Sequence, residues 1–325
     1  MNRPALLRHI QTILQARGLK PNASLNEVLG HHMRFFRTAC QNAKGEKFTF
    51  KIYLLKRART RKDFQNEIAF YHYASQARLR QFPRFVAGNR NSQHPWILYH
   101  FIPGVSFTAY LKKNKRPKPK LIKQLAQTML AYGSLKLPAR TKRQLRWNNS
   151  ALDFAARFRS LISGSRKPVL LKYLRQNELE ALARIIAFHK DADRRDLPVG
   201  LSHGDLSTNN LLVQPRGFAV LDWEHVQSAS PAYDVAELWV KEFSKSPWRN
   251  QLVASLAKTQ TDSQKFRWLF CVEVALFCLR DLLLHDRIWH ELHSLQRKRI
   301  IKKLLNYYSR TYRAALRGFV ALNKS

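Results

Sequence analysis

The chain has 325 residues, and its apolar content of 45% is enough for a packed core, which argues against a disordered protein. It has 58 Lys and Arg but only 21 Asp and Glu, so its formal net charge is +37 at pH 7. Such a charge attracts polyanions, although a proteome-wide excess of basic residues would produce the same composition. Three cysteines without paired spacing argue against a disulfide framework or a structural zinc site.

A helix and a β-rich segment are expected at the start of the chain. Residues 3–17 carry apolar side chains at helical spacing, which predicts a first helix. Strands are expected next, joined by a hairpin turn at residues 42–46. Residues 47–54 alternate strictly between apolar and more polar positions, so the strand they predict has one apolar face. The other face carries Thr49, Lys51 and Tyr53.

Further along the chain, the pattern changes from strands to helices. The elements expected here are a helix at 61–77, strands at 82–88 and 96–101, a connector at 102–104, helices at 121–135, 151–162 and 178–189, two short strands around 201–222, and helices from 234 to 325. The longest apolar run, residues 268–279, is too short to cross a membrane. We therefore expect a cytoplasmic protein of α+β class, whose basic surface could bring it to the periphery of a membrane.

Polar side chains with oxygen atoms follow two of the short strands. The segment that begins at His203 places Asp205 and Asn210 five positions apart, and an apolar pair anchors its end. Asp222 then follows the apolar run 218–221. Phosphoryl transfer needs one group that orients the attacking hydroxyl and two that hold magnesium. The spacing predicts such a site, although an Asx-rich turn would give the same residues in the loop.

Lys51 and Glu67 form a second candidate pair. A lysine in the middle of a strand needs an anion nearby if it is buried, and Glu67 lies at the edge of the apolar stripe of the following helix. Each residue alone more often faces solvent, and Asp63 competes with Glu67 for the role. We expect Glu67 to hold Lys51 in position.

In their order along the chain, these features resemble the aminoglycoside phosphotransferase and choline kinase family, small-molecule members of the protein-kinase-like fold. Three motifs carry the resemblance: His203-Gly204-Asp205 with Asn210, then Leu221-Asp222-Trp223-Glu224, then Pro231-Ala232-Tyr233-Asp234-Val235-Ala236. The similar region covers roughly residues 25–240. It implies a two-lobe fold: a small β-rich nucleotide-binding N-lobe with a leading helix at 1–101, and a larger α-helical C-lobe with the catalytic loop, metal site and acceptor site at 102–325.

The resemblance also implies roles for the loop residues. Asp205 would be the catalytic base or would orient the acceptor hydroxyl. Asn210 and Asp222 would bind Mg²⁺. His203 would support the catalytic loop rather than react, and Asp234 would brace it. Asp205, Asn210 and Asp222 would meet between the lobes, opposite the ion-paired ammonium of Lys51.

A nucleotide site is implied in the same way. Lys51 would contact the α- and β-phosphates of ATP, with Glu67 as its partner, and GTP is not distinguished from ATP. The hairpin that would cover the phosphates has a single glycine, Gly30, where a richer loop is common. The remaining nucleotide contacts would come from backbone groups near His100 and Ile102 and from the side chains of Thr49 and Leu212.

The function implied is ATP-dependent transfer of the γ-phosphate to a hydroxyl of a small molecule or glycan. The alternative is a catalytically weak or inactive kinase-like module that binds polyanions. Basic residues within 112–123 would contact anionic lipid or nucleic acid, unless they form a solvated loop, and no obligate protein partner is expected. The charge of the chain favours an anionic or neutral acceptor. The candidates for an acidic pocket that would suit a polycation are Glu237, Glu242, Asp281 and Asp286.

Overall fold

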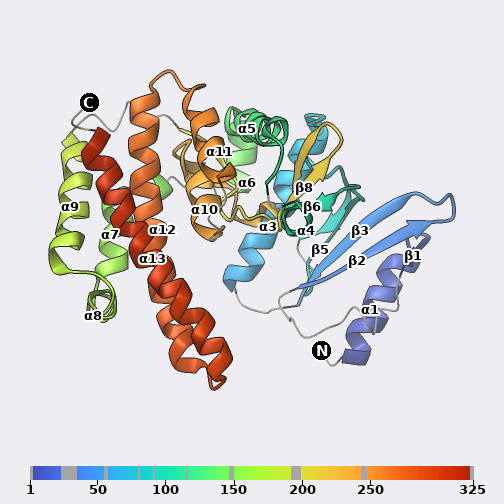
Figure 1. Ribbon diagram of the computed structural model, residues 1–325. Coiled ribbons are helices and arrows are strands. Elements are labelled where there is room, and N and C mark those ends of the chain that lie inside the picture. Colours follow the sequence, from blue (N-terminus) through green and yellow to red (C-terminus); the bar gives the residue numbers. More distant parts are fainter. Residues whose placement is uncertain are drawn as a thin grey trace. The chain divides into compact units, whose positions relative to one another are not determined.

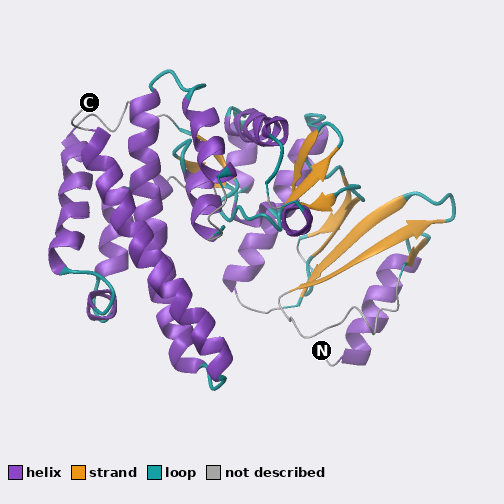
Figure 2. Cartoon of the chain, in the orientation of Figure 1, coloured by secondary structure: helices purple, strands orange, loops and turns teal. Residues whose placement is uncertain are grey.

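The computed structural model describes residues 3–22, 35–54, 58–79, 81–90, 92–114, 116–145, 150–191, 199–242 and 247–322. The chain forms two compact units. The first comprises Met1–Val105, Leu137–Arg146 and Leu212–Val226, and the second comprises Ser106–Lys136, Trp147–Leu211 and Gln227–Ser325. Strands are concentrated in the first unit and helices in the second (Figure 2). The expected α+β class is confirmed, while the expected boundary at residues 101 and 102 stays a prediction.

An antiparallel sheet of five strands organises the first unit. The strand order is β1-β2-β3-β5-β4, so β3 lies at the centre of the sheet. The strands are β1 (Leu19–Pro21), β2 (Phe35–Asn42), β3 (Lys47–Tyr53), β4 (Phe85–Asn89) and β5 (Trp96–His100). The hairpin predicted at residues 42–46 joins β2 to β3. The predicted glycine loop around Gly30 lies outside the described residues.

Two helices cover opposite faces of this sheet. Helix α1 (Arg3–Gln15) packs its apolar side on one face, where Phe48, Phe50 and Ile52 of β3 form a core with it (Figure 1). The alternation predicted for residues 47–54 is therefore confirmed. Helix α3 (Ala58–Gln76) lies on the other face, toward which Lys51 and Tyr53 point.

The rest of the first unit comes from distant parts of the chain. Helix α6 (Ala139–Gln144) packs on α3. A second sheet has the order β6-β8-β9, with β6 at Val105–Ser106, β8 at Leu211–Gln214 and β9 at Gly217–Val220. The chain then enters a short 3₁₀ helix, Trp223–His225. The Trp223 ring is fully buried and stacks on Phe70 of α3 with a centroid distance of 4.5 Å, which fixes the turn that follows β9.

Helices dominate the second unit. The two longest, α12 (Ser263–Glu291) and α13 (Leu295–Leu322), lie side by side as a helical hairpin (Figure 1). The others are α4 (Phe107–Lys113), α5 (Pro119–Gly133), α7 (Phe154–Ile162), α8 (Arg166–Leu171), α9 (Gln176–Asp191), α10 (Tyr233–Lys241) and α11 (Trp248–Ala257), with a 3₁₀ turn at Ser150–Leu152. Strands β7 (Gly200–Ser202) and β10 (Gln227–Ala229) pair antiparallel.

The structure corrects two sequence predictions in detail. Four short strands, rather than two, lie between residues 200 and 229. Strand β4 begins at Phe85 rather than at Phe82, because the ring of Phe82 turns into the core and packs on Phe70 and Trp223. In the part of the chain that is described, no helix is both long and apolar enough to cross a membrane.

Candidate active site

Lys51 is the centre of a buried charge cluster in the first unit. Its side chain has no exposed surface, and its Nζ lies 2.9 Å from Oε2 of Glu67 and 2.8 Å from Oδ1 of Asp222. The same ammonium lies over the Phe35 ring, 4.4 Å from its centroid. One cation therefore balances two carboxylates, one from α3 and one from the turn after β9. A lysine enclosed in this way needs such partners, because burying an unpaired charge is costly.

The ionisation of the cluster follows from sharing one ammonium. Burial lowers the pKa of Lys51, but the carboxylates of Asp222 and Glu67 outweigh it and hold that pKa well above 10.5. Burial raises the pKa of Glu67 to about 7, although Lys51 opposes the shift. Burial would also raise the pKa of Asp222, but Lys51 outweighs it, so this pKa lies below 3.8. Asp222 is the better-ionised of the two carboxylates, and it is also the more exposed, at 21% against 0% for Glu67.

Local contacts fix the position of Asp222. The residue adopts a left-handed backbone conformation with φ 63°, which non-glycine residues rarely adopt and Asp tolerates better than most. Its backbone N–H donates to the hydroxyl of Tyr71 at 3.0 Å. The neighbouring Glu224 accepts a hydrogen bond from the hydroxyl of Tyr53, whose oxygen also lies 3.3 Å from Oε2 of Glu67. These contacts aim the Asp222 carboxylate at Lys51.

A cavity of about 260 Å³ lies in the same unit. Three of the residues predicted for the nucleotide pocket, Thr49, Ile102 and Leu212, line it together. His100 does not line it, and its backbone N–H donates to the carbonyl of Arg84 at 2.9 Å. The lining residues that the sequence did not single out are Arg37, Thr38, Ala39, Tyr99, Phe101, Gly104 and Leu221.

Gly104 is needed where the connector passes β8. Its φ is +155°, and a Cβ at this position would lie 2.9 Å from the carbonyl oxygen of Val213 and 3.2 Å from Cβ of Leu212. A larger residue would push the connector away from β8 and so displace part of the cavity wall. Gln214 adds a hydrogen bond from its side chain to the carbonyl of Pro103, at 3.1 Å.

The second unit holds the loop 203–210 between β7 and β8. Asp234, near the start of α10, accepts hydrogen bonds from the backbone N–H groups of His203 and Gly204, at 2.8 Å and 3.1 Å. The hydroxyls of Ser202 and Tyr132 donate to the same carboxylate, at 2.7 Å and 2.9 Å. Asp234 is thus saturated by protein donors, which confirms the expectation that it braces the loop.

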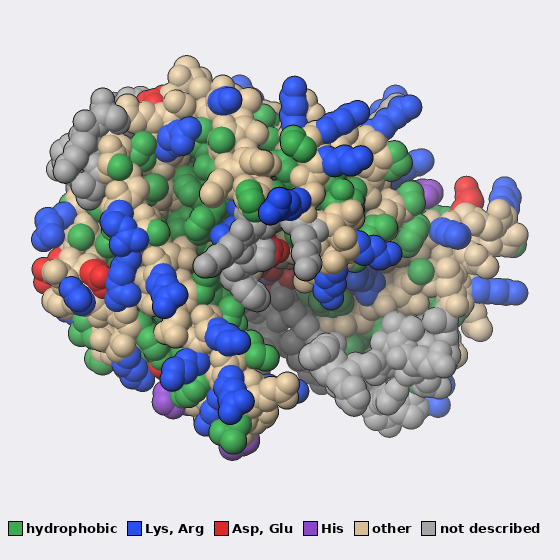
Figure 3. Space-filling model, viewed as in Figure 1, with side chains coloured by type: hydrophobic (Ala, Val, Ile, Leu, Met, Phe, Trp, Pro, Cys, Tyr) green, Lys and Arg blue, Asp and Glu red, His purple; other side chains and the backbone are tan. Residues whose placement is uncertain are grey.

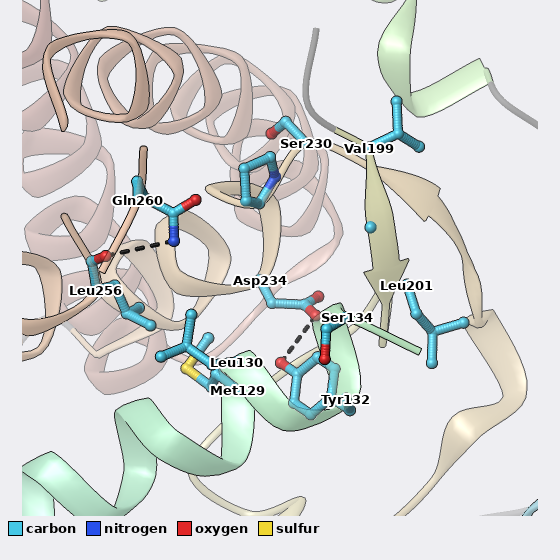
Figure 4. Close-up of a pocket in the computed structure, with 13 residues that line it drawn as sticks. Met129, Leu130, Tyr132, Ser134, Val199, Leu201, Ser230, Asp234, Leu256 and Gln260 are labelled. Carbon is cyan, nitrogen blue, oxygen red and sulfur yellow. Dashed lines mark hydrogen bonds between the residues drawn. The ribbon is translucent and has the colours of Figure 1, made fainter. Parts of the chain in front are cut away.

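Figure 4 shows Tyr132 and Asp234 joined by this hydrogen bond on the wall of a cavity of about 220 Å³. Apolar side chains such as Met129 and Leu256 make up much of the remaining wall. Neither Asp205 nor Asn210 lines this cavity. It therefore lies apart from the residues predicted to act on substrate.

Within the loop, His203 is fully buried and its Nδ1 accepts the backbone N–H of Asp205 at 3.2 Å, a supporting role as expected. Asn210 donates its side-chain N–H to the carbonyl of Asp205 at 3.1 Å. With its N–H group bound in this way, the Asn210 side chain still has its amide oxygen, which is the atom that a cation would need. The Asp205 side chain is 46% exposed.

Glu237, three residues after Asp234, braces the loop a second time. It is fully buried and accepts the backbone N–H of Leu206 at 3.0 Å. Burial raises its pKa, opposed by Lys241 and Arg280. Residues three apart lie on the same face of a helix, so α10 presents both carboxylates to one loop.

The structure thus groups the predicted residues into two sets. Lys51, Glu67, Asp222, Thr49, Ile102 and Leu212 belong to the first unit, and Asp205 and Asn210 to the second. The expected meeting of Asp205 and Asn210 with Asp222 joins residues of different units and stays a prediction. In the described ranges, no group of three or more His, Cys, Asp or Glu side chains could hold a metal ion.

Sequence reasoning missed two cations that contact Asp205 and Glu237. Lys241 forms an ion pair with Asp205, and Arg280 contacts Glu237 at 2.9 Å. The sequence holds one signal for Lys241, its position four residues after Glu237 on the same helix. It holds none for Arg280, which comes from α12.

Comparisons with known proteins agree with this architecture. A model of the phosphotransferase enzyme family matches residues 34–269. The solved GDP and kanamycin complex of APH(2″)-IIIa is 17% identical to this chain, covers 92% of it and 98% of its own length, and has a TM-score of 0.63. The structure of aminoglycoside phosphotransferase APH(4)-Ia is 12% identical to this chain and has a TM-score of 0.59. The match covers 95% of this chain and 98% of that one.

At these identities the solved structures show a shared fold, the one that the sequence motifs implied. A comparison with curated protein sequences gave no match. The family model spans β2 to β5 of the first unit's sheet and both strand-end motifs, and it ends within α12. The chain therefore belongs to the phosphotransferase enzyme family.

Proposed function

We propose that this protein transfers the γ-phosphoryl group of ATP to a hydroxyl group of a small molecule or glycan. The observation that carries the proposal is the loop 203–210. Its backbone is held by two buried carboxylates, while Asp205 stays 46% exposed in a chain of the phosphotransferase family. Similar solved structures contain GDP with kanamycin, and ADP or AMP-PNP with hygromycin B, which supports a nucleotide donor and a hydroxylated acceptor.

The nucleotide would bind in the first unit. The base and ribose would lie in the cavity of about 260 Å³, against Thr49, Ile102 and Leu212, with a backbone contact near Ile102, since the N–H of His100 is bonded to Arg84. An ammonium has three N–H donors, and Lys51 gives two of them to Glu67 and Asp222. The third would bind a phosphate oxygen, and Glu67 would hold the ammonium in place.

Mg²⁺ would be held by Asp222 and Asn210. Carboxylate and amide oxygens are ligands that Mg²⁺ prefers, and Asp222 is partly exposed, with a pKa below 3.8 because Lys51 outweighs burial. When bound, the ion would neutralise phosphate charge. Asp205 would accept the proton of the acceptor hydroxyl as the new O–P bond forms and the bond between the β- and γ-phosphates breaks, with ADP as the leaving group.

Transfer of labelled phosphate tests the proposal directly. Purified protein is incubated with Mg²⁺, labelled ATP or GTP, and a panel of hydroxylated acceptors. Asp205→Asn should lower the rate about 10²- to 10⁴-fold, the usual contribution of a general base, without loss of secondary structure. Asp262→Asn, an exposed helix cap outside the loop, is the matched control and should keep the wild-type rate. Equal rates in Asp205→Asn and wild type would refute the mechanism.

The basic segment 112–123 is a separate proposal. Its charged residues end α4 and begin α5, and the described ones are exposed. They would bring the protein to an anionic lipid or nucleic acid surface. Binding to anionic vesicles should fall steeply as salt rises, and neutralising Lys112, Lys113 and Lys120 should weaken it. Vesicle binding that ignores both changes would rule this contact out.

A further inference from the structure

Asp205 shares its surroundings with two cations. The ammonium of Lys241 forms an ion pair with Asp205 and lies 3.1 Å from Oε1 of Glu237. Arg280 donates to the same Glu237 oxygen at 2.9 Å and to Asp281 at 2.8 Å. Because one oxygen binds both cations, Lys241 and Arg280 lie next to each other beside the residue proposed to accept the hydroxyl proton.

Exposure differs between the two signs of charge in this cluster. The side chains of Glu237 and Asp281 are 0% and 6% exposed, whereas those of Lys241 and Arg280 are 27% and 39% exposed. Apart from Asp205 itself, the part of the cluster that solvent reaches is therefore cationic. A ligand that approaches Asp205 meets ammonium and guanidinium groups rather than carboxylates.

Three of the four acidic residues that could have suited a polycationic acceptor are used inside the protein, whereas Glu242, at the end of α10, is half-buried. Glu237 binds Leu206, Lys241 and Arg280, and Asp281 binds Arg280. Asp286 is 7% exposed and accepts hydrogen bonds from Tyr173 at 2.6 Å and Lys172 at 3.3 Å. A ligand ammonium could bind these carboxylates only by displacing the protein donors that they already hold.

The two cations keep donors for a ligand. The Lys241 ammonium has three N–H donors, and Asp205 and Glu237 account for two. Arg280 has five, and its described contacts with Glu237 and Asp281 use two. A neighbouring ammonium and guanidinium are well suited to a phosphate or carboxylate.

We propose that the acceptor carries an anionic group, phosphate or carboxylate, close to the hydroxyl that is phosphorylated, and that Lys241 and Arg280 bind this group. The proposal rests on the proposed function, since it names the acceptor class of the same site. Lys241 has a second effect as a positioning residue: its contact with Asp205 holds that carboxylate near the anionic group of the acceptor.

Binding of inorganic phosphate tests the cationic pair without catalysis. Titration calorimetry compares wild type with the double variant Lys241→Met and Arg280→Met. The matched control is Lys258→Met with Arg310→Met, two exposed residues of the same unit that remove the same charge. The cluster variant should bind phosphate about tenfold more weakly or worse, and the control should bind it like wild type. Equal affinities in the two double variants would overturn the proposal.

Kinetics with acceptors of different charge provide the second test. Glucose, glucose 6-phosphate, gluconate and kanamycin share hydroxyl groups and differ in charge. We expect the anionic members to have the highest kcat/KM. The cluster variant should raise their KM about tenfold or more and leave the KM for ATP unchanged, whereas Lys241→Arg should retain most of the affinity. A higher kcat/KM for glucose or kanamycin than for both anions would contradict the inference.

The two hypotheses fail in different ways. The proposed function is wrong if the wild type forms no labelled product and releases no more ADP than the Asp205→Asn variant. In that case the phosphate titration still decides whether the cation pair binds anions. If the wild type is active but prefers neutral or cationic acceptors, the function stands and the inference is wrong. Circular dichroism of each variant separates a lost contact from a lost fold.

Discussion

At the scale of single residues, the Lys51 cluster shows how one cation sets the state of two carboxylates. Glu67 is enclosed by α3 and the sheet, whereas Asp222 keeps part of its surface in water. A buried trio with one positive and two negative charges carries a net negative charge, and the more enclosed acid bears more of that penalty. Glu67 therefore resists ionisation, while Asp222 stays charged.

The pKa of Glu67 leads to a prediction about stability. Burial raises this pKa from 4.5 to about 7, so the folded protein holds a proton that the unfolded chain releases between these values. The free energy of unfolding should therefore fall as pH rises from about 4.5 to about 7 and then level off. Glu67→Gln should lack this part of the pH dependence. Urea unfolding of both proteins at pH 5 and pH 7.5 measures the difference.

The difference between the two proteins isolates Glu67, because the other titrating groups are common to both. We expect wild type to lose stability relative to Glu67→Gln on going from pH 5 to pH 7.5. A constant gap, or one that changes in the opposite direction, would show that Glu67 is ionised throughout this range.

How far the sequence predicted the site differs between residues. Lys51 and Glu67 could be paired in advance because a strand and the next helix bring them together by local connection. Lys241 and Arg280 could not, because their neighbours depend on how α10 and α12 pack against the loop 203–210. Periodicity shows which face of a helix is buried, but not which distant loop that face will meet.

At the scale of elements, α10 supports the loop 203–210. Asp234 and Glu237 bind three backbone N–H groups, those of His203, Gly204 and Leu206. A loop of this kind has no regular hydrogen-bond ladder, so side chains must satisfy its buried donors. The motif at residues 231–236 signalled the first contact, while nothing in its pattern pointed to Glu237.

Asp234→Asn should loosen this loop. Each oxygen of Asp234 accepts one of the two backbone N–H groups, so an amide in either orientation would set its NH₂ against the N–H of His203 or Gly204. We expect a loss of about 3 kcal/mol in stability, faster hydrogen exchange at His203 and Gly204, and a lower kcat with the KM for ATP retained. Hydrogen exchange read by mass spectrometry reports the loop directly.

Ser202→Ala provides a graded comparison for the same brace. It removes the hydroxyl that donates to Asp234 and accepts the N–H of Gly204, but it leaves Asp234 intact, so it should cost about 1 kcal/mol and change exchange at His203 little. If Asp234→Asn were as stable as Ser202→Ala and its loop equally protected, the brace would not depend on the second carboxylate oxygen.

The strands near the loop 203–210 were harder to predict than the long helices. Strands β7 and β10 have three residues each and β8 and β9 have four, too short for alternation to show. Their backbones become strands because neighbouring segments offer hydrogen-bond partners, a property of the packed chain. Helix α12 has 29 residues without Gly or Pro, and an uninterrupted segment of that length is predicted as a helix.

At the scale of the whole molecule, basic side chains are spread along the chain, whereas most acidic ones lie after residue 150. Lys and Arg side chains are scattered over the visible face of both units, with few Asp and Glu among them (Figure 3). Residues 1–150 hold 30 of the 58 basic residues and only 4 of the 21 acidic ones. Many of the acidic side chains that the structure describes are buried in ion pairs with basic partners, so a large part of the surface excess has no opposite charge nearby.

An excess of like charge destabilises the compact state, because unfolding lets the charges separate. Salt screens this repulsion, since the Debye length falls from about 30 Å at 0.01 M to about 8 Å at 0.15 M. We therefore expect the Tm to rise as NaCl increases from 0.02 M to 0.3 M at pH 7. The buried pairs at Lys51 and Glu237 are shielded from salt and should oppose this change only weakly.

The choice of anion separates screening from specific binding. Repulsion that is merely screened should give equal rises in Tm with sodium chloride and sodium bromide, neither of which is a phosphate or a carboxylate, at equal ionic strength. Phosphate should add a further rise if it occupies the cation pair, because a ligand that binds only the folded protein stabilises it. That extra rise should vanish in the variant with Lys241→Met and Arg280→Met and persist in the one with Lys258→Met and Arg310→Met. A Tm that stays constant or falls with added NaCl would show that the net charge of +37 does not strain the fold.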